Sequence, residues 1–153
     1  MLESIKVNEV HLTISQIYEF YKEGHFILHG KDDEVSDMTF AFDHSICGIT
    51  LPNFHAITSV GEDGKYKYDV FKGASYLSSM FEFMDNKSKT SSVFLPDASE
   101  MTYQQLPSVI SKRFSNGGVR ICAYDKYNCE KDALLKVIAM LSPNCLESLS
   151  VNL

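Results

Sequence analysis

Two alternating segments around a short turn constrain the fold of this chain most strongly. The turn spans residues 61–64, where Gly61 and Gly64 enclose two acidic residues. Residues 55–60 precede it, and residues 65–71 follow it with lysine and tyrosine in alternation. Polar, glycine-bounded turns between β-type segments are typical of hairpins, so we predict an antiparallel strand pair. The period of two puts Tyr66, Tyr68 and Val70 on one face of the second strand, with Lys65, Lys67 and Asp69 on the other.

Four segments carry apolar residues at the three- and four-residue spacing of a helix face. The first begins with Thr13 and Gln16 at capping-box spacing and ends at Gly24. The others are residues 74–84, 107–115 and 128–141, and the last has the broadest apolar face. The sequence therefore predicts three to four helices.

Further strands are predicted from short β-type runs. These runs are residues 25–29, 38–42, 46–51, 93–95, 119–124 and 149–151, with a polar loop over residues 31–36. Strands and helices do not alternate regularly, which argues against a doubly wound fold. We predict a single α+β domain over residues 1–153, with a mostly antiparallel sheet.

Composition narrows the class of protein. The chain has 153 residues, 44% of them hydrophobic, and a formal net charge of −6, which excludes a disordered chain. A strong basic excess, usual in nucleic-acid-binding domains, is missing, so we expect no direct nucleic-acid partner. The N-terminus lacks a signal-peptide pattern, and the longest apolar run, residues 137–141, is far shorter than the roughly 20 residues of a membrane span. We therefore expect a cytoplasmic protein with no membrane partner.

The charge is unevenly distributed along the chain. Residues 1–63 hold 11 acidic and 3 basic side chains, whereas residues 64–153 hold 9 acidic and 11 basic ones. Such asymmetry predicts an acidic face for a basic protein partner, although a solvated loop is the plainer explanation. The expected partner-binding residues are Asp32, Asp33, Glu34, Asp37, Asp43, Glu62 and Asp63. The acidic run over residues 31–37 lacks the ligand spacing of an EF-hand calcium loop.

Histidines and cysteines offer little chemistry. On a strand, His25 and His29 would stand about 13 Å apart, too far for one metal ion. His44 and Cys47, with Cys122 and Cys129, could form a zinc site, but the paired short spacings of a zinc finger are absent. Cys47 and His44 could also form a nucleophilic pair, yet the apolar neighbours of Cys47 predict a core position. We expect reduced, mostly buried thiols, and no catalytic residue, metal or cofactor.

In its small size, its acidity and its lack of a catalytic motif, the chain resembles the immunity proteins of bacterial toxin systems. Those of contact-dependent growth inhibition are the nearest type. The resemblance extends to no specific motif, so it assigns no residue a role. It implies a protein without enzymatic activity that occludes the active site of a basic toxin, such as a nuclease, with an acidic face. The alternatives are an acidic chaperone of a secreted effector, usually a dimer, and a small hydrolase that uses Cys47.

Overall fold

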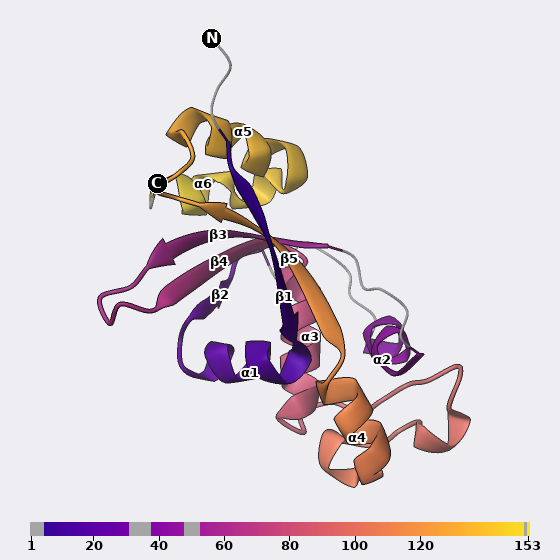
Figure 1. Cartoon of the computed structure of the whole chain (residues 1–153). Coiled ribbons are helices and arrows are strands. Elements are labelled where there is room, and N and C mark those ends of the chain that lie inside the picture. Colours follow the sequence, from indigo (N-terminus) through magenta and orange to yellow (C-terminus); the bar gives the residue numbers. More distant parts are fainter. Residues whose placement is uncertain (1–4, 31–37, 48–52, 152) are drawn as a thin grey trace.

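A five-stranded sheet organises the chain in a computed structural model that describes residues 5–30, 38–47, 53–151 and 153 (Figure 1). The strands are β1 (Val7–Thr13), β2 (Phe26–Leu28), β3 (Phe54–Val60), β4 (Tyr66–Lys72) and β5 (Gly118–Asp125). Their order across the sheet is β1-β5-β3-β4-β2, so β1 and β2 form its two edges. In the described parts of the chain, no helix has the length and apolarity needed to cross a membrane.

The predicted hairpin is confirmed as the antiparallel pair β3 and β4, in which Val60 faces Tyr66 and Thr58 faces Tyr68. The prediction of a mostly antiparallel sheet is wrong in part, because β5 runs parallel to β3 and β2 runs parallel to β4. Two helices, α3 (Ala74–Met84) and α4 (Ser108–Ser115), lie along the chain between β4 and β5. A long crossover of this kind is what parallel pairing requires, so the α+β class holds while the sheet is mixed.

The helices outnumber the three to four predicted, with six α-helices among the described residues. They are α1 (Ile14–Lys22), α2 (Met38–Cys47), α3 (Ala74–Met84), α4 (Ser108–Ser115), α5 (Lys131–Leu141) and α6 (Leu146–Ser150). The capping box predicted at Thr13 and Gln16 is present at the start of α1. Helices α3, α4 and α5 confirm the other three predictions within a few residues at their ends.

Three predicted strands, residues 38–42, 93–95 and 149–151, are wrong, and a fourth lies mostly outside the described residues. Residues 38–42 begin α2, where Phe42 and Ile46 are both buried at four-residue spacing, so helical packing overrides the alternation. The predicted strand 46–51 falls on the end of α2 and on residues outside those described. Residues 93–95 lie in an exposed loop, and residues 149–151 form the end of α6, with Leu149 buried, and the turn after it. Conversely, β1 has mainly exposed residues and gives no strong alternation to detect.

Each face of the sheet packs against its own helices, and Figure 1 shows α5 and α6 on one side and α1, α3 and α4 on the other. The larger core is rich in phenylalanine and includes Phe26, Phe54 and Phe114. In it, the four helices α1, α2, α3 and α4 pack against the sheet. The smaller core lies under α5 and α6, around Phe71, Tyr124 and Ile138. We call the side with the larger core the α1 face.

Candidate functional site

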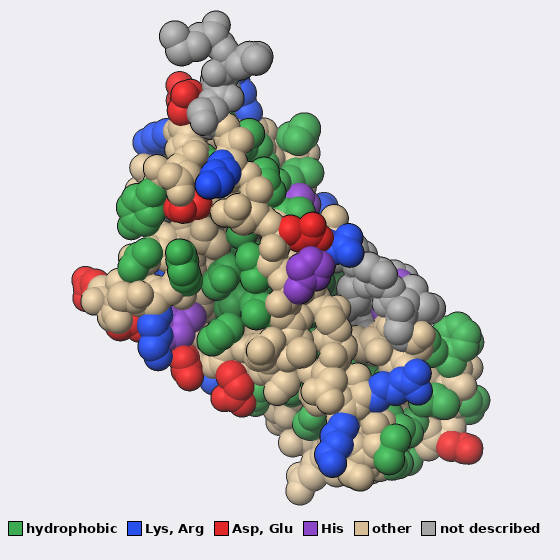
Figure 2. Space-filling view, in the orientation of Figure 1, with side chains coloured by type: hydrophobic (Ala, Val, Ile, Leu, Met, Phe, Trp, Pro, Cys, Tyr) green, Lys and Arg blue, Asp and Glu red, His purple; other side chains and the backbone are tan. Residues whose placement is uncertain are grey.

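The α1 face of the sheet is not covered along its whole length. Where β3 ends and β4 begins, the strands form an open hollow of about 190 Å³. Its lining residues come from four strands: Asn8, Val10, Thr58, Tyr66, Tyr68, Ala123 and Asp125. We call these residues, together with Val60, the tyrosine surface. Figure 2 shows hydrophobic side chains in this area between the hairpin and α1, with charged side chains close to the hairpin tip.

Tyr68 ties the tyrosine surface to the core. Its ring stacks on Phe26, with centroids 4.6 Å apart and planes 15° apart, and Phe26 stacks in turn on Phe20. The pKa of the Tyr68 hydroxyl is raised, mainly by burial and further by Tyr66. The hydroxyl therefore stays protonated at neutral pH and can donate a hydrogen bond. The Tyr68 ring therefore forms the base of the hollow and is held in place by the core.

Tyr66 and Val60 are the exposed apolar members of the tyrosine surface. They face each other across the hairpin, and their side chains remain 62% and 46% exposed. A tyrosine that is rigidly held by a strand gives a partner a large contact area at low cost in conformational entropy. Because cross-strand neighbours share one patch, the two side chains form a contiguous apolar contact.

Acidic residues lie at the tip of the hairpin next to this patch, where Lys65 Nζ is 3.8 Å from Glu23 Oε2. His25 Nε2 lies 3.5 Å from Glu23 Oε2 and 3.6 Å from Asp63 Oδ2, so the end of α1 and the turn meet at one histidine. Asp63 also accepts a hydrogen bond from the Lys65 N–H at 3.0 Å, which fixes the turn. The His25 carbonyl in turn accepts from the Tyr68 N–H at 2.8 Å. We call Glu23, Glu62 and Asp63 the acidic rim of the tyrosine surface.

The structure brings together only part of the acidic face predicted from the sequence. Glu62 and Asp63 are exposed at the turn. Asp32, Asp33, Glu34 and Asp37 lie outside the described residues. Asp43 is a correction, because its side chain is buried at 4% exposure and accepts hydrogen bonds from the Ser92 hydroxyl and the Val93 N–H. Asp43 therefore fixes the loop of residues 92–95 and presents no charge to a partner.

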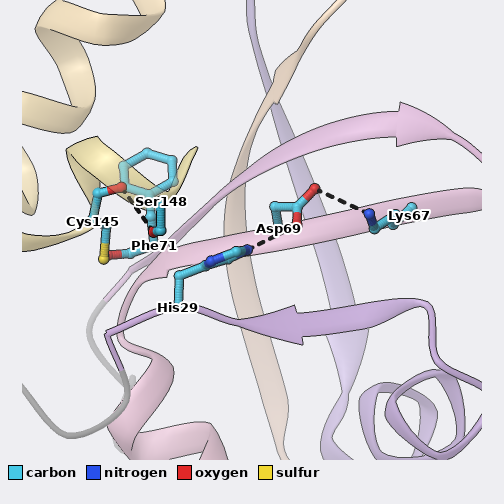
Figure 3. Close-up of polar contacts among 6 residues, drawn as sticks. All are labelled: His29, Lys67, Asp69, Phe71, Cys145 and Ser148. Carbon is cyan, nitrogen blue, oxygen red and sulfur yellow. Dashed lines mark hydrogen bonds and ion pairs between the residues drawn. The ribbon is translucent and has the colours of Figure 1, made fainter. Parts of the chain in front are cut away.

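The histidines of the β2 segment contact separate groups. His25 contacts the acidic rim, whereas His29 Nε2 lies 2.8 Å from Asp69 Oδ1. Figure 3 shows His29 and Asp69 pointing at each other, with Lys67 4.0 Å from the second carboxylate oxygen. Across the parts of the chain that the structure describes, no group of three or more His, Cys, Asp and Glu side chains is arranged to hold a metal ion.

The cysteines are all free, but their expected burial is confirmed only for Cys145. Cys145 contacts the Phe71 carbonyl, also drawn in Figure 3. Cys47, expected in the core, is exposed at the end of α2, beside a cavity of about 430 Å³ that includes Phe94 and Arg113.

Cys122 and His55 are register partners on β5 and β3, so a thiol and an imidazole lie on neighbouring strands. Burial raises the pKa of the Cys122 thiol, and Glu9 raises it further. Burial and Lys72 lower the pKa of His55. Both shifts favour the neutral forms, whereas a nucleophilic pair needs a thiolate. His55 Nδ1 lies instead 3.0 Å from the Tyr124 hydroxyl, in a packed position.

Comparisons with protein-family models, with curated proteins and with solved structures give no match for this chain. The candidate site is therefore defined by its geometry.

Sequence reasoning identified the hairpin, the shared face of Tyr66 and Tyr68, and the acidic turn. It missed Glu23 and His25 as members of the site, because they reach the turn through the packing of α1 and β2 against the hairpin. It also missed Val10 and Ala123, which come from strands remote in sequence. Glu23 and His25, on either side of Gly24, are the only local sequence signal that could have placed α1 next to the hairpin turn.

Proposed function

We propose that this protein binds a basic protein partner and neutralises it, in the manner of an immunity protein. The proposed contact area is the tyrosine surface with its acidic rim. The observation that carries the proposal is the exposed pair Tyr66 and Val60, held on a rigid hairpin beside Glu62 and Asp63. Aromatic anchors at the centre of a patch, with polar groups around them, are the usual composition of a protein-binding site.

Each part of the surface has a distinct task in this proposal. Tyr66 and Val60 supply apolar area that is removed from water on binding. The acidic rim attracts a basic surface and selects against acidic ones, an effect mainly on the association rate and on specificity. If the partner is a nuclease, acidic side chains would occupy the positively charged site that otherwise binds phosphate. Inhibition then follows from occlusion and requires no catalytic residue in this chain.

Binding and protection assays test the proposal with the product of the neighbouring gene as the probe. We expect the immobilised protein to capture it tightly at low salt and more weakly at high salt, and to inhibit its activity. Tyr66→Ser should weaken binding by more than tenfold, the size of a hot-spot contact of about 2 kcal/mol. The control is Met140→Ser on α5, because Met140 is 74% exposed on the opposite side of the sheet.

A second pair of variants tests the acidic rim. Glu62→Lys combined with Asp63→Asn should slow association and flatten the dependence of affinity on salt. Glu147→Lys combined with Asp97→Asn changes the net charge by the same amount at exposed positions elsewhere, and should have little effect. Equal effects of the two double variants would show that only net charge matters, and would remove the acidic rim from the proposal.

The chaperone and hydrolase alternatives give different results in the same assays. A chaperone would hold the partner without inhibiting its folded, active form. A hydrolase that uses Cys47 would lose its own activity on alkylation of that exposed thiol, whereas an immunity protein would keep its inhibitory activity. Capture without inhibition, or no capture at all, would overturn the immunity function.

A further inference from the structure

The outer edge of β1 has the properties of a self-pairing surface. β1 ends the sheet on one side, and four of its seven residues are exposed while the other three are half-buried. Figure 1 shows β1 running along the front of the sheet, with β5 as its neighbour on the inner side. An exposed edge strand offers unpaired backbone groups to another strand unless it is protected.

Hydrogen bonds at the two ends of β1 show which backbone groups face outward. The Ile14 N–H donates to the Gly117 carbonyl at 3.0 Å, and the Lys6 N–H and carbonyl both contact Cys129 Sγ, on the β5 side. Backbone groups of successive residues in a strand point to opposite edges. The even-numbered residues therefore bond to β5, and the N–H and C=O groups of Val7, Glu9 and His11 point away from the sheet.

We propose that two copies of this chain associate through antiparallel pairing of β1 with β1, on a two-fold axis through Val10. In this register Glu9 of one copy faces His11 of the other, and the symmetry repeats the pair. Both residues have outward-facing backbone groups, so each Glu9–His11 pair exchanges both N–H···O=C hydrogen bonds. Val10 meets its own copy as the closer, non-hydrogen-bonded pair between them.

Pairing of an acidic with a basic side chain selects this register over the neighbouring ones. Within one chain, Glu9 Oε1 already lies 3.3 Å from His11 Nε2 and 2.6 Å from Arg120 Nε. The two-fold through Val10 sets the same acid and base opposite each other across the seam, on one face of the sheet. A shift of the axis by one residue in either direction sets like residues, Glu9 or His11, against their own copies. The strand also ends the pairing itself, because the Thr13 N–H is already bonded to Gln16 Oε1 at 2.9 Å.

The dimer would join two sheets into one and bring the Asn8 and Val10 ends of the two tyrosine surfaces together at the seam. The inference depends on the β1 edge and not on the proposed function. A dimer is also what the chaperone alternative expects, so the inhibition assays, and not the oligomeric state, separate those two functions.

Sedimentation equilibrium of the full chain over a wide concentration range tests the proposal. We expect a reversible monomer–dimer equilibrium that His11→Pro abolishes. Proline removes an N–H that faces outward, which an edge strand tolerates, so circular dichroism and thermal unfolding should remain close to those of the wild type. A protein that stays monomeric at the highest soluble concentration would overturn the proposal, as would a dimer that His11→Pro leaves unchanged.

A charge exchange tests the register. His11→Glu places acid opposite acid twice and should weaken the dimer about tenfold. Combining it with Glu9→Lys again sets opposite charges face to face and should restore most of the affinity. Val109→Glu, which adds one acid at an exposed position on α4, should leave the dimer unchanged. If the double variant is weaker than His11→Glu alone, the pairing of Glu9 with His11, and with it the proposal, is wrong.

Discussion

The two ends of the β3–β4 hairpin differ in burial although one alternating pattern runs through both. At the end next to α3, Phe54, Ala56 and Val70 are fully buried in the larger core. At the turn, Val60 and Tyr66 lie on the same face but are largely exposed. Residue type alone therefore does not decide burial. The helices cover one end only, and the open end leaves apolar side chains exposed to solvent.

Close packing at the closed end makes it intolerant of change. Gly73 follows β4 directly, has φ +85°, and starts α3. A Cβ added there would lie 2.1 Å from Cδ1 of Phe54. Gly64, in the turn at the open end, has a similar φ of +77° but no atom within 4 Å of an added Cβ. The two glycines share a backbone requirement, and only Gly73 also has a packing requirement.

Phe54→Ala should give the largest effect, a loss of about 3–5 kcal/mol in the free energy of unfolding. Phe54 has no exposed surface, and its removal leaves a cavity where β3, β4 and Gly73 meet. Chemical denaturation, with the midpoint and the m-value fitted separately, measures the change. A loss below about 1 kcal/mol would contradict the description of this end as close-packed.

Gly73→Ala should cost about 2–3 kcal/mol, because strain at positive φ adds to the overlap with the Phe54 ring. The matched control is Gly64→Ala, which has the strain without the overlap and should cost about 1 kcal/mol. The difference between the two variants isolates packing from backbone conformation. Equal losses would mean that Phe54 moves aside freely, so that the closed end is softer than the structure indicates.

Much of this fold was predictable because its signals are local. The hairpin, α1 and α3 to α5 follow from turn glycines, a capping box and helical spacing within short windows. The strand predicted at residues 38–42 fails because Met38, Phe40 and Phe42 alternate, whereas the buried residues that decide the structure, Phe42 and Ile46, are four apart. Parallel pairing of β5 with β3 is set by a crossover and has no local signature.

The candidate site was predictable in part for the same reason. Tyr66, Glu62 and Asp63 are close in sequence, so their proximity follows from the hairpin alone. Asp43 was expected at the surface because acidic residues are rarely buried, yet two hydrogen bonds satisfy its carboxylate in the interior. Val10 and Ala123 complete the tyrosine surface through strand order, which the sequence does not specify.

Acid should destabilise the fold through His55. Its ring packs against Phe71 and Tyr124 of the smaller core, and burial and Lys72 lower its pKa below the ordinary value of 6.5. Between the folded-state pKa and pH 6.5, the unfolded chain binds more protons at His55 than the folded chain does. The contribution of His55 to the free energy of unfolding is therefore complete above pH 6.5 and is lost as the pH falls toward the folded-state pKa. Unfolding midpoints measured across this range should fall with pH in the wild type and fall less in His55→Gln. Identical pH profiles would contradict a half-buried His55 that stays neutral in the folded state.

Tyr66→Ser should give the smallest effect on stability, within about 0.5 kcal/mol of the wild type, because the side chain is mostly in water already. Tyr68→Ser, on the same strand, removes the ring that stacks on Phe26 and should cost at least about 2 kcal/mol. Denaturation of both variants under one condition measures the contrast along two residues of β4. A large loss for Tyr66→Ser would show that its ring supports the fold. The open end would then be structural, and an exposed aromatic would no longer support partner binding there. A small loss of stability for Tyr66→Ser, combined with weaker capture of the partner, would show that the two ends of the hairpin have different roles. The end next to α3 would then stabilise the fold, and the turn would bind the partner.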